Sequence, residues 1–349
     1  MQNKQSWDRA SWLLFLLPIF AMILTIVTLI DIHRVEDVSD VVDAYRDLLE
    51  EDRHPLTGEI VDEAVDVLPQ VFGVMVENAA DAWPLSGLDK AFLVIEAPVE
   101  AGIPRFLVLF EEDVEVEKVG PVRSARPYYL DWALGLDAIY GHVGGSPEAL
   151  DLIASLGVID VNQFFESEYF YRQTWGGRYA PHNVYTDGEL LRGILDEFEL
   201  DAPVYDFWKF ADGESKGNSS AAIDFADGTT YDMEWEYDEE TNQYQRMQGG
   251  GPVLMSDGAA IYADNVLVMA TDIRTIDAVG RKELLSVGTG DAYILQNGEG
   301  YLGVWEKESH ESQLRFLTTD GYEISMNAGV TWIEVVDGLD QAELYEAGL

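Results

Sequence analysis

The chain has 349 residues, of which 47% are hydrophobic, and its 21 basic and 65 acidic residues give a formal net charge of −44. So acidic a protein repels nucleic acid phosphates and anionic lipid headgroups over most of its surface. The absence of cysteine excludes disulfides, thiolate nucleophiles, cysteine-ligated metals and a lipid on an N-terminal cysteine. We interpret the acidity as solvation in a saline medium rather than as a binding surface.

The first predicted element is a membrane anchor. Residues 12–30 are 19 consecutive residues without a charge, which at 1.5 Å per helical residue is about the thickness of a bilayer core. Lys4 and Arg9 precede this run and acids follow it, so residues 1–11 are expected in the cytoplasm and the rest outside. The alternative is a cleaved signal peptide, but the run is long and no A-x-A-like site follows it.

Residues 31–53 form an acidic stalk with a helical spacing of apolar residues. Residues 54–210 then alternate between strand-like and helix-like segments, which predicts an α/β layered domain. The expected strands are short apolar runs: Val71–Glu77, Ala91–Glu96, Arg105–Phe110 and Ala138–Val143.

Three helix starts carry recognisable signals. Pro127 suits the first position of a helix that continues through Trp132, and Ser146 with Pro147 predicts a capped helix that Gly157 closes. Thr186 to Glu189 reads as a capping box that opens a helix to about Phe198.

The pattern of apolar residues changes after a predicted linker at 211–219. Residues 220–337 carry alternating strand patterns, the last of them at Val330–Val336, and the hairpin dipeptides Asn297-Gly298 and Asp320-Gly321. These signals indicate an all-β domain before a tail at 338–349. The predicted fold class is therefore α+β: an N-terminal membrane helix, then an α/β layered domain, then an all-β domain.

A cluster of scarce basic residues marks the first candidate binding site. Lys118, Arg123 and Arg126 fall within nine positions just before the Pro127 helix, together with Ser124. A helix N-terminus favours an anion, and arginine can hold phosphate or carboxylate through two hydrogen bonds. The alternative is that these arginines simply pair with some of the many acids.

Two further turns lead from strands into helices. One contains His142, Gly144, Gly145 and Ser146, and the other contains His182 and Asn183. Such turns gather at one edge of a layered α/β domain, where ligands usually bind. With Arg105, the three turns predict a cleft for an anionic or polar ligand, although each histidine taken alone fits a core position equally well.

Catalysis has weaker support. Ser124 or Ser146 with His182 and a carboxylate such as Glu77 or Glu96 could form a hydrolase triad, and His142 is the other candidate base. No G-x-S-x-G elbow and no H-E-x-x-H spacing occurs. We therefore expect no metal and no cofactor, and whether the protein is an enzyme stays open.

An ordered series of motifs resembles the DUF3048 family of YerB-like bacterial lipoproteins over about residues 54–337. The motifs include HPLTG from His54, WPLSGL from Trp83, KVGPVRSAR from Lys118, HVGGS from His142, PHNVY from Pro181 and GVWEK from Gly303. The resemblance implies an envelope protein exposed outside the membrane and divided into two domains, without an established activity or catalytic residue.

The chain departs from the family pattern in two places. Relatives are often anchored by a lipidated cysteine, which this chain lacks, and the family leads us to expect a histidine where this chain has Gly251 to Ser256. Any metal or acid–base role for that histidine is therefore in doubt here.

The leading hypothesis is a membrane-anchored extracytoplasmic protein that binds an anionic envelope ligand, such as a phosphorylated glycan or a lipid-linked phosphate. A hydrolase or transferase acting on envelope material is the alternative, and a protein-interaction scaffold is the third possibility. Nucleic acid is not an expected partner, and the sequence names no protein partner.

Overall fold

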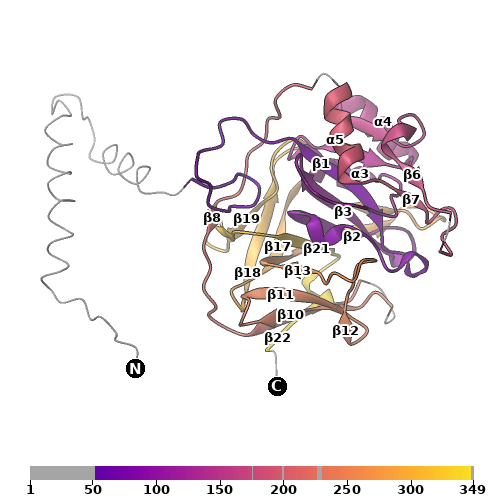
Figure 1. Cartoon of the computed structure of the whole chain (residues 1–349). Coiled ribbons are helices and arrows are strands. Elements are labelled where there is room, and N and C mark those ends of the chain that lie inside the picture. Colours follow the sequence, from indigo (N-terminus) through magenta and orange to yellow (C-terminus); the bar gives the residue numbers. More distant parts are fainter. Residues whose placement is uncertain (1–51, 175, 199, 226–229, 347–349) are drawn as a thin grey trace, which may run out of the picture. The chain divides into compact units, whose positions relative to one another are not determined.

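The computed structural model describes residues 52–346 except 175, 199 and 226–229 (Figure 1). From Arg53 onward the chain forms one compact unit. The predicted anchor at 12–30 and all of the predicted stalk up to residue 51 lie outside the described residues. In the described part, no helix is both long and apolar enough to cross a membrane.

A mixed ten-stranded sheet runs through the middle of the unit (Figure 1). Its central strands are rich in β-branched and other apolar residues, as in the VFGVMVE of β1. In sheet order the strands are β19 (Arg315–Thr318), β18 (Glu299–Lys307), β17 (Gly288–Gln296), β14 (Asn265–Ala270), β21 (Thr331–Val336), β2 (Leu93–Pro98), β3 (Pro104–Glu111), β1 (Val71–Glu77), β4 (Ile139–His142) and β5 (Asp160–Asn162).

Side chains alternate between the two faces along each strand, and a hydrophobic core covers each face of this sheet. Even-numbered residues of β1, such as Phe72 and Val76, belong to one hydrophobic core, and Val71 and Met75 belong to the other. Helices α3 (Pro127–Leu134) and α4 (Pro147–Leu156) cover the second face; α5 (Gly188–Glu197) packs into the first core.

A second sheet of six strands packs into the first core, at the bottom of Figure 1. Its strands alternate buried and exposed side chains, as expected for a sheet with one face toward solvent. They are β12 (Gly251–Pro252), β11 (Gln243–Gln248), β10 (Met233–Asp238), β9 (Ser219–Ile223) and β22 (Ala342–Glu346), with β13 (Tyr262–Ala263) paired to β11.

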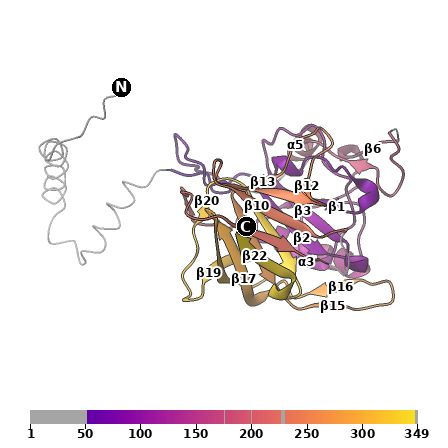
Figure 2. The ribbon, with the colours of Figure 1, turned by 90° about the horizontal axis from the view of Figure 1, so that it is seen from below.

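Short elements complete the described part. Viewed from below, the β15–β16 hairpin extends from one end of the body (Figure 2). The two-stranded pairs are β15 (Ile273–Thr275) with β16 (Lys282–Leu284), β20 (Met326–Asn327) with β8 (Phe210–Ala211), and β6 (Tyr171–Arg172) with β7 (Val184–Tyr185). The 3-10 helices are η1 (Ala80–Ala82), η2 (Leu88–Lys90), η3 (Glu100–Gly102), η4 (Ser167–Tyr169) and η5 (Leu339–Gln341).

The predicted fold class is wrong. The described residues are mostly β-sheet with three short α-helices, so the first half is not an α/β domain of alternating strands and helices. Strands from both halves also share one sheet, because β21 pairs in parallel with β2, with Leu93 opposite Thr331 and Glu96 opposite Glu334. The alternation of strand-like and helix-like segments suggested α-helices between the strands. In the structure, the segments between β1, β2 and β3 are mainly turns and 3-10 helices.

The boundaries predicted at 54–210, 211–219 and 220–337 stay predictions about sequence units. In the structure β9 begins at Ser219, close to the end of the predicted linker, and the predicted tail at 338–349 contains η5 and β22.

Local predictions fared better. The strands expected around β1, β2, β3, β4 and β21 are confirmed, as are the helix that begins at Pro127 and the helix capped by Ser146 and closed by Gly157. The capping box is displaced by one residue: Asp187 caps α5, and the Thr186 hydroxyl instead donates to the Tyr169 carbonyl.

Candidate functional site

The candidate anion site begins with a cross-strand pair at the end of the central sheet. Glu77 ends β1 and lies opposite Arg105 at the start of β3. Both side chains are buried on the sheet face that carries α3 and α4. A buried acid and a buried base on one face need partners, and the neighbouring loops supply them.

The segment before α3 brings in two more guanidinium groups. The Arg123 amide donates to the Met75 carbonyl, which ties the segment to β1. Arg126 is the N-cap residue of α3, and its Nε donates to Glu100 Oε1 at 2.8 Å. Arg105 Nη1 donates to the Ser124 carbonyl at 2.6 Å, and its Nη2 lies 3.9 Å from Glu100 Oε2.

His182 closes the group from the other side. Its Nδ1 is hydrogen-bonded to Glu77 Oε2 at 2.6 Å, and Arg123 Nη1 donates to the Pro181 carbonyl at 3.2 Å. Arg123 Nε lies 3.6 Å from Glu77 Oε2. We call Arg105, Arg123, Arg126 and His182, with Glu77 and Glu100, the arginine cluster.

Burial governs the charges in the arginine cluster. Burial raises the pKa of Glu77, although Arg123 and the hydrogen bond from His182 oppose that rise. Burial and the nearby Arg126 lower the pKa of Arg105. Solvent reaches the cluster through Arg123 and His182, whose side chains are 24% and 26% exposed.

The ring of His142 is hydrogen-bonded to residues outside the arginine cluster. The ring is fully buried, with Nδ1 bonded to the Gly144 carbonyl at 2.7 Å and Nε2 bonded to Asp160 Oδ1 at 2.5 Å. Both ring nitrogens are therefore engaged in holding the turn after β4. That arrangement leaves His142 no nitrogen with which to act as a base on a ligand.

The glycines and serine that follow have local structural roles. Gly144 has a φ of 58°, and a Cβ there would lie 2.8 Å from Phe164 Cε2. Gly145 packs closely on Ala125, to which it is bridged. The Ser146 hydroxyl accepts the Ala149 amide as the N-cap of α4.

Ser146→Ala should consequently lower the free energy of unfolding by about 1 kcal/mol, the usual loss for an N-cap hydroxyl. Ser146→Asp should retain nearly all of the stability, because its carboxylate can accept the same amide. Urea unfolding of the three proteins measures this difference. Equal stability of the alanine and aspartate variants would show that the hydroxyl is not acting as a cap.

The side chains of Lys118 and Asn183, also predicted for the cleft, contact residues outside the arginine cluster. Lys118 Nζ donates to Gln173 Oε1 and lies 4.2 Å from the centre of the Tyr185 ring. Asn183 is buried and accepts a hydrogen bond from Arg172. In the described part of the chain no serine hydroxyl is hydrogen-bonded to His182. Nor do His, Asp and Glu side chains there form a group of three arranged to hold a metal ion.

The opposite face of the same sheet holds a buried ionic centre that sequence reasoning missed. Glu96 on β2 and Glu334 on β21 are register partners, and both side chains are fully buried. Arg246 reaches them from β11 of the second sheet. Its Nη2 lies 2.7 Å from Glu96 Oε2, and its Nη1 donates to Glu334 Oε1 at 2.9 Å.

Aromatic and amide groups enclose this centre. The Arg246 guanidinium lies 5.0 Å from the ring centre of Trp332 and 5.7 Å from those of Phe106 and Trp235. Trp235 donates to Glu334 and Asn78 donates to Glu96. Burial and the neighbouring Glu96 raise the pKa of Glu334 well above its ordinary value, although Arg246 opposes the rise.

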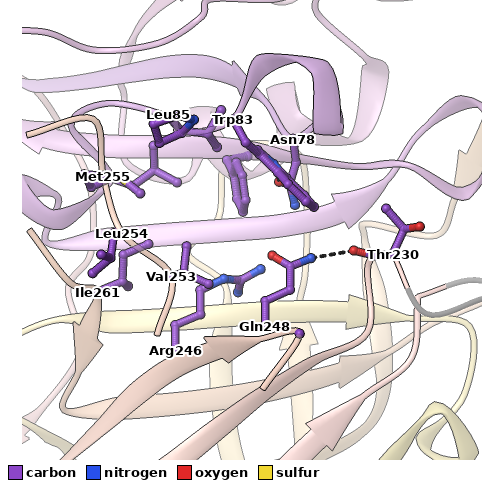
Figure 3. Close-up of a pocket in the computed structure, with 14 residues that line it drawn as sticks. Asn78, Trp83, Leu85, Thr230, Arg246, Gln248, Val253, Leu254, Met255 and Ile261 are labelled. Atoms are coloured by element: carbon purple, nitrogen blue, oxygen red, sulfur yellow. Dashed lines mark hydrogen bonds between the residues drawn. The ribbon is translucent and has the colours of Figure 1, made fainter. Parts of the chain in front are cut away.

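A pocket of about 440 Å³ opens beside this centre. Figure 3 shows Asn78, Trp83 and Leu85 on one wall and Arg246, Gln248 and Val253 on the facing wall. The walls come from the two halves of the chain, so the pocket exists only where the two sheets meet.

Sequence signals for this second centre were present. Glu334 interrupts the apolar run of β21, and Glu96 follows one in β2. Arg246 sits at an inward position of a strand whose side chains alternate. A charge at an inward strand position marks a buried polar network, but its partners depend on pairing between distant strands.

Comparisons with known proteins bear on both centres. Models of the N-terminal and C-terminal domains of the family described as "Protein of unknown function (DUF3048)" match residues 56–201 and 221–333. The chain is also 30% identical over 312 residues to a Bacillus subtilis protein described as "Putative lipoprotein YerB". That alignment covers 86% of this chain and 91% of the relative. The chain belongs to the DUF3048 family. The resemblance predicted from the sequence motifs is therefore confirmed.

The fold agrees with the solved structure of a similar protein. The crystal structure of the YerB protein from Bacillus subtilis matches with a TM-score of 0.74 and 28% sequence identity, covering 84% of this chain and 99% of that one. The arginine cluster falls inside the DUF3048 N-terminal match, and Arg246 falls inside the C-terminal match. The segment in which the family led us to expect a histidine contributes Val253, Leu254 and Met255 to the pocket.

Proposed function

We propose that this DUF3048 protein is an extracytoplasmic envelope protein that binds an anionic ligand at the arginine cluster. The description of its relative as a lipoprotein supports the envelope location. The apolar run at 12–30, with Lys4 and Arg9 before it, would hold the protein to the membrane with the following residues outside.

The observation that carries the proposal is a local excess of positive charge on a strongly acidic chain. Three guanidinium groups, at Arg105, Arg123 and Arg126, converge on two carboxylates, Glu77 and Glu100, which leaves a net charge of about +1. Arg123 Nε is also buried without a hydrogen-bond partner. Partly desolvated arginines with an incomplete set of acceptors suit an anion such as phosphate.

The envelope location narrows the ligand class. Phosphorylated glycans and lipid-linked phosphates are among the anionic materials of a cell envelope, and both present a phosphate group to arginine. Nucleic acid is disfavoured because a net charge of −44 would repel a long polyanion. A small phosphate group can reach the cluster without bringing many further charges against the acidic surface.

A thermal shift experiment on the full chain tests the proposal. Phosphate, pyrophosphate and glucose 1-phosphate, added at matched ionic strength, should raise the melting temperature of the wild type. A ligand at 100 times its dissociation constant adds about 2.7 kcal/mol to the free energy of unfolding. The Arg123→Gln/Arg126→Gln variant should lose this response, whereas Arg274→Gln, which alters an exposed ion pair on the β15–β16 hairpin, should keep it.

Other outcomes favour other functions. If no anion raises the melting temperature and the double variant is merely less stable, the arginines are structural and an interaction scaffold gains support. A hydrolase or transferase would use His182, since the buried Glu77 can orient its ring as a carboxylate orients a catalytic base. Binding is favoured over catalysis because no serine hydroxyl in the described residues is hydrogen-bonded to that histidine.

A further inference from the structure

The pocket at the junction of the two sheets is separate from the arginine cluster. Glu77 and Arg105 point to the face of the central sheet that carries α3 and α4, whereas Phe106 and Glu96 point to the face that the second sheet covers. The two sites therefore lie on opposite faces, and a ligand in one does not occupy the other.

The wall of this pocket differs from the rest of the surface. Of the described residues that line it, only Arg246 is ionisable, although 65 of the 349 residues are acidic. Most of the wall is apolar. The volume of the pocket, about 440 Å³, falls in the usual range for small-molecule sites, roughly 300–1,000 Å³. In addition to Val253, Leu254 and Met255, the apolar lining residues are Trp83, Pro84, Leu85, Leu88, Phe106 and Ile261.

The polar end of the pocket is held rigidly. Arg246 is only 2% exposed, and two buried carboxylates and three aromatic rings fix its guanidinium. Asn78 also lines the pocket; it donates to Glu96 and accepts from Trp83 Nε1, both at 2.8 Å. A preorganised donor at the end of an apolar pocket fixes how a ligand is oriented.

Charge balance decides which ligand suits this end. Two buried acids, Glu96 and Glu334, already contact Arg246, and burial with the adjacent Glu96 raises the pKa of Glu334 well above its ordinary value. An anionic ligand would add an uncompensated negative charge in a buried place, which is costly. An uncharged acceptor, such as a carbonyl oxygen, adds a hydrogen bond without a charge.

We propose that this pocket binds a small uncharged ligand with an apolar body and a carbonyl-type acceptor directed to Arg246. The apolar body lies between Trp83 and Leu85 on one wall and Val253 on the other (Figure 3). The acceptor meets the end lined by Arg246 and Asn78. This inference does not depend on anion binding at the arginine cluster.

The test uses prodan, an uncharged naphthalene with a propionyl carbonyl whose emission shifts to the blue in apolar surroundings. Titration of the full-length protein should give a saturable blue shift with one site per chain. 2-(Dimethylamino)naphthalene, which lacks the carbonyl, should compete about tenfold or more weakly, because it loses a charge-assisted hydrogen bond. Tighter binding of the anionic dye 1,8-ANS than of prodan at this site would overturn the assignment to an uncharged ligand.

Two matched substitutions test whether prodan binds in this pocket. Val253→Trp fills the pocket and should weaken prodan binding at least about tenfold, whereas Val279→Trp makes the same change at a side chain that is 73% exposed on the β15–β16 hairpin and should have no effect. If Val253→Trp does not fold, Leu254→Trp replaces it, since Leu254 also lines the pocket and is already 46% exposed. Wild-type affinity in a folded pocket-filling variant would overturn the proposal.

Discussion

Replacing Arg246 with methionine is expected to lower the free energy of unfolding by about 3–5 kcal/mol at pH 8, because removing one partner of a buried ion pair leaves an uncompensated buried charge. Glu96 and Glu334 are fully buried, and Arg246 is the cation that contacts both. Methionine fills most of the space of the arginine stem, so the loss should come mainly from charge rather than from packing.

The loss should depend on pH in a defined direction. An acid whose pKa is raised in the folded state, as that of Glu334 is, costs stability as pH rises above its ordinary value of 4.5. The Arg246→Met variant should therefore come closer to wild-type stability below pH 4.5, where Glu334 can be buried neutral, and diverge from it toward pH 8. Urea unfolding at the two pH values measures the difference.

Two comparisons make that result specific. The triple variant Arg246→Met/Glu96→Gln/Glu334→Gln should recover much of the loss at pH 8, since it buries no unpaired charge. Arg274→Met should change stability by less than about 1 kcal/mol, because the pair of Arg274 with Glu283 is exposed. An equal loss for Arg246→Met at both pH values would mean that packing, not charge, explains it.

Local elements of the fold could be predicted because their signals are local. Val71–Glu77 and Thr331–Val336 are short apolar runs, and Ser146 with Pro147 fixes a helix start whatever surrounds it. The predicted division into an α/β part and a β part is wrong for the fold, because β21 from the second half lies between β14 and β2 and so joins both halves in one sheet. Pairing between strands so distant in sequence leaves no trace in either strand alone.

The two centres show the same limit. Arg123 and Arg126 stand close together before a helix, so their cluster could be predicted from spacing. Arg105 was also part of the predicted cleft, whereas Glu77 was named only as a possible triad carboxylate. Their direct opposition comes from the pairing of β1 with β3, which spacing alone does not predict. Arg246 joins Glu96 and Glu334 only because two sheets stack, so its inward position could suggest burial but not its partners.

Replacing Glu111 with glutamine is expected to stabilise the protein at pH 8. Burial and, to a smaller extent, the negative charges of Asp113, Glu59 and Glu112 together raise the pKa of Glu111 to about 7. The folded protein therefore binds this proton more tightly than the unfolded chain, whose value is 4.5. Stability is lost as pH rises between these two values and stays lost above pH 7.

The full shift corresponds to about 3 kcal/mol, and we expect about 1–3 kcal/mol for Glu111→Gln at pH 8 because the side chain is 23% exposed and partly screened by solvent. His54 does not offset the repulsion between Glu111 and the neighbouring acids at pH 8. Its Nε2 lies 3.5 Å from Glu111 Oε2, but burial lowers the pKa of His54 and leaves the ring neutral.

Melting temperatures of wild type and Glu111→Gln at pH 4.5 and pH 8 measure this effect. The variant should gain only at pH 8, and 1 M NaCl should reduce the gain, because salt screens the repulsion from Asp113 and Glu59 but does not remove the cost of burial. Glu240→Gln, which changes an exposed acid in the turn between β10 and β11, should be neutral at both pH values. A gain of the same size in that control would trace the stabilisation to the overall charge of −44 rather than to Glu111.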